Sequence, residues 1–279
     1  MNHYTTHIKA KAGWFDMDFK ELYQYKDLIW LFFKRNYSSF YRQTVLGPLW
    51  LICNPLISVI LYAFVFGRLA GLSTEGVPTF VFYLCSNTLW AFFMTSVTQI
   101  SKTFMDNANI FGKVYFPRLV IPLSSLMRGV LDLVIQLVML VICIIAYAVK
   151  GLHFDIGFNI LLAPVLILQT CILGLGVGII IASLTTRFRD LIILTGFGMQ
   201  LWMYATPVVY TLDIVPQKFM WIYVLNPMTP VIECFRNVML GIDTVAWNYW
   251  WISMVATVVI MTIGLMLFGR IEKTFMDTI

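Results

Sequence analysis

Charged residues are scarce in this chain. Only 12% of its 279 residues are charged, whereas 60% are hydrophobic, and a soluble domain carries roughly 25% charged residues. A single water-facing core cannot bury so much apolar surface, so we expect the chain to reside in a lipid bilayer. The net charge of +5 includes no basic stripe, which argues against nucleic acid as a partner.

The residue types that carry catalysis or bind metals are also few. The three histidines, His3, His7 and His153, lie in the polar N-terminal segment and in a short loop, and the five cysteines are not paired at the spacing of a metal site. The sequence has no phosphate-binding loop of the form G-x-x-x-x-G-K-[ST]. We therefore expect no catalytic residue, metal or cofactor in this chain, and a partner must supply any energy.

Long uncharged runs, in contrast, are abundant. A membrane-spanning helix needs about 20 apolar residues at a rise of about 1.5 Å each. Six runs reach this length, which predicts an all-α polytopic membrane protein with six transmembrane helices. The predicted spans are residues 43–67, 76–101, 133–149 with an extension back to Arg128, 156–186, 191–212 and 244–269.

The basic residues predict the orientation. With the N-terminus inside, fourteen of the 19 lysines and arginines fall in cytoplasmic segments and four in outer segments, and Arg128 lies in the third span. Such a bias marks the cytoplasmic side. We expect one domain over residues 1–279 in the cytoplasmic, or inner, membrane. It comprises a cytoplasmic segment at 1–42, six spans within 43–269 and a cytoplasmic tail at 270–279.

Three shorter segments accompany the spans. Residues 19–41 place polar and apolar side chains on two helical faces, which predicts an amphipathic helix on the cytoplasmic membrane surface. The inner loop 103–116 forms either a helix that docks on a partner or an ordinary solvated loop. The run 219–232 is uncharged but too short to span a bilayer. Because Asn226-Pro227 divides this run, it predicts two short helices that re-enter the outer face.

Few polar or small residues stand out within these segments. Arg128 and Asp132 are four residues apart and can pair on one helix face. A charged side chain buried in a membrane span usually indicates a functional site. The alternatives to a functional role are a structural ion pair or an Arg128 side chain that snorkels to the membrane surface. Glu233 and Arg236 are three apart and are expected to form a local pair. The glycines of residues 174–178 are expected to allow close helix packing.

Several stretches together resemble a known family. They are YRQTVLGPLW at 41–50 with Asn54-Pro55, NIFGKVYFPR at 109–118 with Ile121-Pro122, TRFRD at 186–190, TPVVY at 206–210, and the segment from Asn226-Pro227 to Phe235-Arg236. In this order they resemble the membrane subunit of type-2 ABC exporters. The resemblance is to the subfamily that moves lipid-linked polysaccharides: O-antigens, capsular polysaccharides, rhamnans and teichoic acids.

The resemblance implies a transport subunit rather than an enzyme. Two copies would pair around a conduit, and two ABC ATPase subunits would bind ATP and Mg²⁺ on the cytoplasmic side. It implies that the inner loops couple to the ATPase, at Asn109, Ile110, Phe111, Gly112, Lys113, Phe116, Arg187 and Arg189. It also implies an aromatic conduit, for which the candidates are Tyr62, Phe66, Trp90, Phe93, Trp202, Tyr204 and Tyr210.

Other interpretations stay open at this point. Aromatic side chains also form interfacial belts and packing in any membrane protein, so each conduit candidate has a structural alternative. No sequence motif identifies the substrate of a type-2 exporter, so export of a drug, lipid or peptide is a second hypothesis. A membrane acyl- or glycosyltransferase acting on lipid-linked sugars is a third, and it would require an essential acid or base.

Overall fold

The described part of the chain is helical throughout. The structure, a computed structural model, describes residues 19–42, 47–111 and 116–274, and every regular element in these ranges is a helix. The α-helices are α1 (Phe19–Gln24), α2 (Lys26–Arg42), α3 (Trp50–Tyr62), α4 (Thr79–Ser101), α5 (Thr103–Asp106), α6 (Ala108–Phe111), α7 (Val120–Val149), α8 (Ala163–Thr185), α9 (Leu191–Tyr204), α10 (Met220–Leu225), α11 (Met228–Leu240) and α12 (Trp250–Thr274). The predicted all-α class is confirmed.

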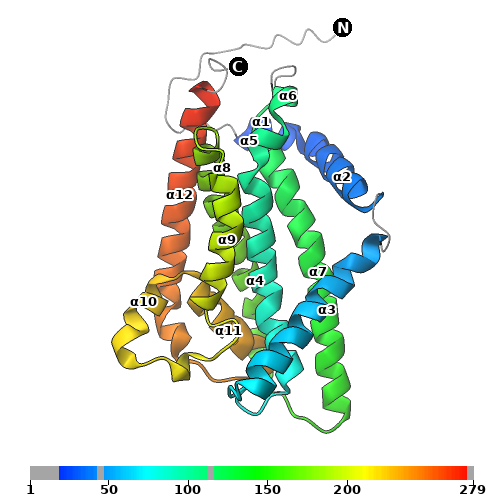
Figure 1. Ribbon diagram of the computed structural model, residues 1–279, viewed down its shortest axis with the longest axis vertical. Coiled ribbons are helices and arrows are strands. Elements are labelled where there is room, and N and C mark those ends of the chain that lie inside the picture. Colours follow the sequence, from blue (N-terminus) through cyan, green and yellow to red (C-terminus); the bar gives the residue numbers. More distant parts are fainter. Residues whose placement is uncertain (1–18, 43–46, 112–115, 275–279) are drawn as a thin grey trace.

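Five helical stretches are long and apolar enough to cross a bilayer. They are Gly47–Leu69, Thr79–Ser101, Val120–Val149, Phe158–Thr185 and Val245–Ile271. Each overlaps one of the predicted spans. They run side by side through the bundle, with α1 and the C-terminal end of α12 at one end and α10 and α11 at the other (Figure 1).

The fifth predicted span, residues 191–212, is not confirmed. Its helix, α9, has only 14 residues, or about 21 Å at the helical rise, against a hydrocarbon core of about 30 Å. Pro207 explains the early end, because a proline disfavours helical backbone at the residue before it. That residue, Thr206, instead donates its hydroxyl to the carbonyl of Trp202 at 2.8 Å.

The third span begins earlier than predicted. Helix α7 starts at Val120, and Pro122 lies in its first turn. A proline is tolerated there because the first N–H groups of a helix have no intrahelical acceptor. The prolines of this region therefore do not interrupt the span, and Arg128 lies in the third turn of the helix rather than at its start.

Helix α4 forms the centre of the bundle. It packs against α3, α7, α8, α9 and α11, and most of its side chains are buried. Close packing by the glycines of α8 is confirmed. A Cβ added at Gly178 would lie 2.7 Å from Cβ of Ile100 on α4, and one added at Gly264 on α12 would lie 2.9 Å from the Gly176 carbonyl oxygen.

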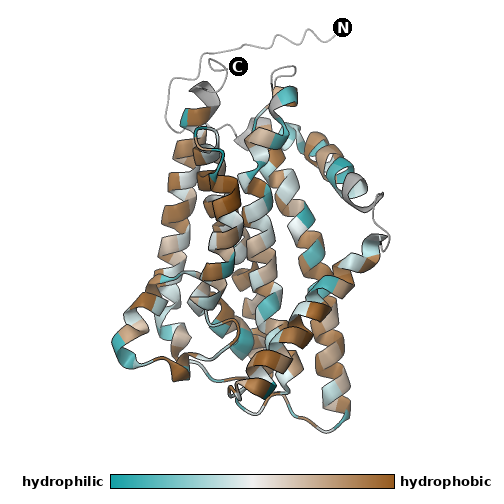
Figure 2. Cartoon of the chain, viewed as in Figure 1, coloured by the Kyte–Doolittle hydropathy of each residue, from teal (hydrophilic) through white to brown (hydrophobic). Residues whose placement is uncertain are grey.

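The outer faces of the bundle are apolar (Figure 2). Helices α3, α7 and α12 all present exposed branched aliphatic side chains, among them Ile57, Ile60, Val138, Ile142, Val255 and Val258. So large an exposed apolar surface is stable in contact with lipid chains and unstable in water. The exposure pattern thus agrees with a multi-pass membrane protein.

Helix α2 lies outside the bundle, against α7 (Figure 1). Its two faces differ as predicted, because Phe32 and Phe33 are buried while Lys34 and Arg35 are exposed. The buried face packs on the protein's own α7 and inner loops. Its position on the membrane surface stays a prediction.

The opposite end carries the two short helices predicted around Asn226-Pro227. Helices α10 and α11 meet at this dipeptide (Figure 1). The Asn226 side chain accepts from the Met228 N–H at 3.2 Å and so satisfies one unpaired donor of α11. The depth of these helices in the bilayer stays a prediction.

Candidate functional site: a basic pocket, the inner loops and the aromatic clusters

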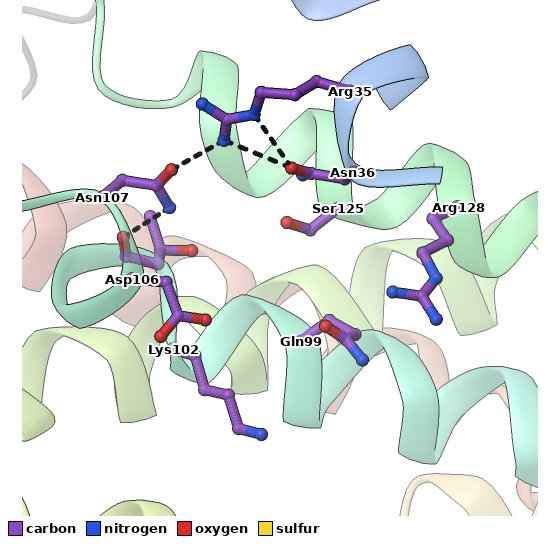
Figure 3. Close-up of a pocket in the computed structure, with 9 residues that line it drawn as sticks. Arg35, Asn36, Gln99, Lys102, Asp106, Asn107, Ser125 and Arg128 are labelled. Carbon is purple, nitrogen blue, oxygen red and sulfur yellow. Dashed lines mark hydrogen bonds between the residues drawn. The ribbon is translucent and has the colours of Figure 1, made fainter. Parts of the chain in front are cut away.

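A polar pocket opens at the end of the bundle that carries α1. It measures about 450 Å³ and is lined by Arg35, Asn36, Gln99, Lys102, Thr103, Asp106, Asn107, Ser125 and Arg128. We call this the basic pocket. Its walls come from α2, the C-terminal end of α4, α5 and the early turns of α7 (Figure 3). It therefore lies where the spanning helices α4 and α7 reach this end of the bundle.

Arg35 is held in place on one wall of the basic pocket. Its Nη2 donates to Oδ1 of Asn107 at 3.0 Å and to Oδ1 of Asn36 at 3.2 Å (Figure 3). Its guanidinium also lies over the Phe32 ring at 4.7 Å, in a favourable cation–π geometry. These contacts tie α2 to the loop that follows α4.

Arg128 and Lys102 face the same cavity from other helices. Lys102 follows the last turn of α4, where a cation is favoured by the helix dipole. Arg128 extends from α7 on the side where Gln99 lies (Figure 3). Three basic residues and one acidic residue, Asp106, thus line the cavity.

The predicted partner of Arg128 lies one turn deeper in α7. Oδ1 of Asp132 is buried and has no hydrogen-bond partner among the described residues. The Arg128–Asp132 ion pair stays a prediction. What the structure adds is that Arg128 belongs to a wider basic group, which sequence spacing on one helix did not indicate.

The predicted coupling residues divide into exposed and buried ones. Asn109 is exposed and Ile110 is half-buried on α6, whereas Phe111 is 3% and Phe116 is 4% exposed. The rings of Phe111 and Phe116 stack at 5.7 Å, and Phe116 also packs on Phe32 of α2 at 5.7 Å. The two phenylalanines therefore join α2, α6 and the segment that leads into α7, and they present little surface of their own.

The remaining coupling candidates lie nearby or outside the described residues. Arg187 and Arg189 are exposed in the turn between α8 and α9. This turn lies at the same end as the inner loop, because Thr185 donates its hydroxyl to the Ser101 carbonyl at 3.1 Å. Gly112 and Lys113 fall outside the described ranges. An ATPase contact at any of these positions stays a prediction.

Three of the conduit candidates form one aromatic cluster inside the chain. Trp90 and Phe93 on α4 are 1% and 0% exposed. The Trp202 ring on α9 packs against both, with centroid distances of 6.5 Å and 5.3 Å. Trp90 and Phe93 thus support α9 from within, and a polymer reaches them only if α9 moves.

The other candidates lie nearer the surface. Tyr62 donates its hydroxyl to Sδ of Met203 at 3.3 Å, and its ring packs on Phe66. Tyr210 donates to the carbonyl of Tyr204 at 2.9 Å, and Tyr204 is 54% exposed. These rings border α3 and α9 and are available to a passing ligand. Their role as a conduit lining stays a prediction.

A second polar cluster lies at the end that carries α11. Glu233 and Arg236 form a buried ion pair, as their spacing predicts. Glu75, from the loop before α4, faces Asp213, and burial together with this carboxylate raises the pKa of Glu75 to about 7. The sequence did not indicate the Glu75–Asp213 pair, because its members come from loops far apart in the chain.

Comparisons with known proteins identify the family of the chain. The chain is 28% identical over 253 residues to an O-antigen export system permease protein of Klebsiella pneumoniae, covering 90% of this chain and 94% of the relative. It is 28% identical over 222 residues to an O-antigen export system permease protein of Myxococcus xanthus, covering 78% and 82%. Residues 27–240 match the ABC-2 type transporter family. The chain therefore belongs to the ABC-2 type transporter family, as a multi-pass membrane component with a transport rather than an enzymatic role.

Proposed function

We propose that this chain is the transmembrane subunit of an ATP-driven exporter that moves lipid-linked polysaccharide across the cytoplasmic membrane. The observation that carries the proposal is the similarity to O-antigen export permeases, which extends over 90% of the chain. O-antigen, capsular, rhamnan and teichoic acid polymers share the chemistry that such an exporter would handle. Two copies of the chain and two ABC ATPase subunits form the working unit.

The inner loops couple the chain to its ATPase in this proposal. The sequence has no phosphate-binding loop, so ATP and Mg²⁺ belong to the partner. Asn109, Arg187 and Arg189 are exposed at one end of the bundle and offer direct contacts. Phe111 and Phe116 act indirectly, since they hold α6 against α2 and against the segment that leads into α7. A push on α6 would thus reach the spanning helix α7 through packed side chains.

The aromatic side chains between α3 and α9 suit a polymer that must keep moving. Tyr62, Phe66, Tyr204 and Tyr210 offer ring faces, and the hydroxyl groups of Tyr62 and Tyr210 are already bonded within the chain. Such faces pack on the apolar faces of sugar rings without position-specific hydrogen bonds. We place both termini and the basic pocket on the cytoplasmic side, with α9 as the fifth of six spans and α10 and α11 re-entering from the outer side.

Co-expression with the ATPase encoded beside the chain tests the assembly. We expect the tagged chain to purify with its ATPase as a two-plus-two complex that hydrolyses ATP. Arg187→Glu should weaken this association, whereas Lys150→Gln, a matched basic residue on an outer loop, should leave it unchanged. A chain that purifies alone, with no nucleotide turnover, would contradict the proposal.

A deletion strain tests the substrate. Loss of the chain should remove the surface polymer and leave the lipid-linked polymer inside the cell. A surface polymer that persists unchanged, together with increased sensitivity to a drug, would favour the hypothesis of a drug exporter instead.

A further inference from the structure

The basic pocket has the size and composition of an anion site. Its volume of about 450 Å³ greatly exceeds the roughly 30 Å³ that one water occupies. Arg35, Lys102 and Arg128 reach it from three different helical segments, against one acidic side chain, Asp106. Phosphoryl groups are recognised by this combination of guanidinium and ammonium groups.

Neutral donors supplement the basic side chains. The amides of Asn36, Asn107 and Gln99 and the hydroxyl of Ser125 also line the cavity. The Asn107 amide nitrogen already donates to the Thr103 carbonyl at 3.0 Å, which fixes its oxygen toward Arg35. A guanidinium has five N–H donors, so Arg35 retains donors for a ligand after it binds Asn36 and Asn107.

The surroundings of the pocket indicate which molecule carries the anion. Asp132 lies four residues after Arg128 on α7, and beyond it the same face carries Ile135, Val138 and Ile142, of which the last two are exposed apolar side chains. These residues lie within the spanning stretch Val120–Val149. A lipid whose phosphoryl group occupies the pocket would therefore find an apolar path for its hydrocarbon chain.

We propose that the basic pocket binds the phosphate or pyrophosphate group of the lipid that carries the transported glycan, with the hydrocarbon chain of that lipid along α7. The identity of the lipid rests on the proposed export function, whereas the anion site rests on the pocket alone. The pocket would hold the lipid end of the substrate at the cytoplasmic boundary, where transport begins.

Direct binding tests this proposal without any transport assay. The chain and its ATPase are purified together in nanodiscs of neutral lipid and titrated with polyprenyl pyrophosphate. Polyprenol of the same length and inorganic pyrophosphate serve as the other two probes. We expect polyprenyl pyrophosphate to bind at least about tenfold more tightly than polyprenol, because hydrogen bonds to charged groups carry the difference.

Substitutions in the pocket give the second part of the test. Lys102→Gln and Arg128→Gln should each weaken binding of polyprenyl pyrophosphate about tenfold, and Arg128→Lys should retain more affinity than Arg128→Gln. Lys34→Gln is the matched control, since Lys34 lies beside Arg35 on α2 but outside the pocket, and it should bind as the wild type does.

Each outcome has one meaning. Equal binding of polyprenol and polyprenyl pyrophosphate, or wild-type affinity in both glutamine variants, overturns the anion site. Binding of inorganic pyrophosphate as tightly as of the lipid keeps the anion site and overturns the lipid source. If polyprenyl pyrophosphate does not bind but deletion removes the surface polymer, the pocket assignment is refuted and the export function stands. If polyprenyl pyrophosphate binds but deletion leaves the surface polymer in place, the export function alone is refuted.

Discussion

Arg236 is the most consequential buried charge in the described part of the chain. Its side chain is 1% exposed and pairs with Glu233. Its Nη2 donates to the Pro207 carbonyl at 3.0 Å and its Nη1 to the Tyr210 carbonyl at 3.1 Å. The guanidinium also lies over the Phe82 ring of α4 at 4.6 Å. One side chain thus joins α11, the segment after α9, and the central helix.

Arg236→Met should lower the free energy of unfolding by about 3–5 kcal/mol. This is the usual cost when one partner of a buried ion pair is removed and the other charge is left uncompensated. Here Glu233 would stay buried without its cation, and two carbonyl groups would lose their donors. Methionine fills a similar volume, so the loss measures charge and hydrogen bonding more than a cavity.

The assay is unfolding in mixed micelles by titration with sodium dodecyl sulfate, followed by tryptophan fluorescence. The informative control is the double variant Glu233→Gln with Arg236→Met, which leaves no lone buried charge. It should be more stable than Arg236→Met alone, so the two substitutions are not additive. A stability of Arg236→Met within error of the wild type, or strictly additive effects, would refute this reasoning.

Three further predictions concern packing, the α10–α11 junction and pH. Gly178→Ala should lower the free energy of unfolding by about 1–3 kcal/mol, because the added Cβ would lie 2.7 Å from the Ile100 side chain. Gly198→Ala is the control and should cause no loss, because no atom lies within 4 Å of its added Cβ. Equal effects of the two substitutions in the same titration would contradict the packing argument. Asn226→Ala should lower the free energy of unfolding by about 1–3 kcal/mol. It should also shift the tryptophan emission, because Trp202 Nε1 loses its acceptor at 3.1 Å. Unchanged emission would count against this contact. The pKa of Glu75 is raised from 4.5 to about 7, so the folded state binds the carboxyl proton more tightly than the unfolded chain does. The wild type should therefore lose stability relative to Glu75→Gln as pH rises from about 4.5 to about 7. If the stabilities of the two proteins change in parallel across this range, the carboxyl group is not perturbed.

Much of the architecture could be predicted because hydropathy and charge report directly on the membrane. A span has to be apolar along about 20 residues, and five such runs became long helices. The exception, residues 191–212, shows the limit of this criterion. The run is uncharged, but Pro207 ends its helix at Tyr204, and hydropathy does not register the backbone restriction that a proline imposes.

The candidate site could be predicted only where its parts are local in sequence. The Glu233–Arg236 pair followed from a three-residue spacing on one helix. The basic pocket could not be predicted from spacing, since its basic residues come from α2, the C-terminal end of α4 and α7. Only the packing of α2 on α7 brings Arg35 to Lys102 and Arg128. The burial of Phe111 and Phe116 has the same origin, because their environment is made by residues distant in the sequence.

Reconstituted transport tests the central claim most directly. The chain and its ATPase are placed in proteoliposomes with the nucleotide sites facing outward, and lipid-linked glycan is added in the outer leaflet. We predict that the glycan becomes protected from an external glycosidase only when ATP and both subunits are present. A glycan that stays accessible under these conditions, or becomes protected without the ATPase subunit, would contradict the account.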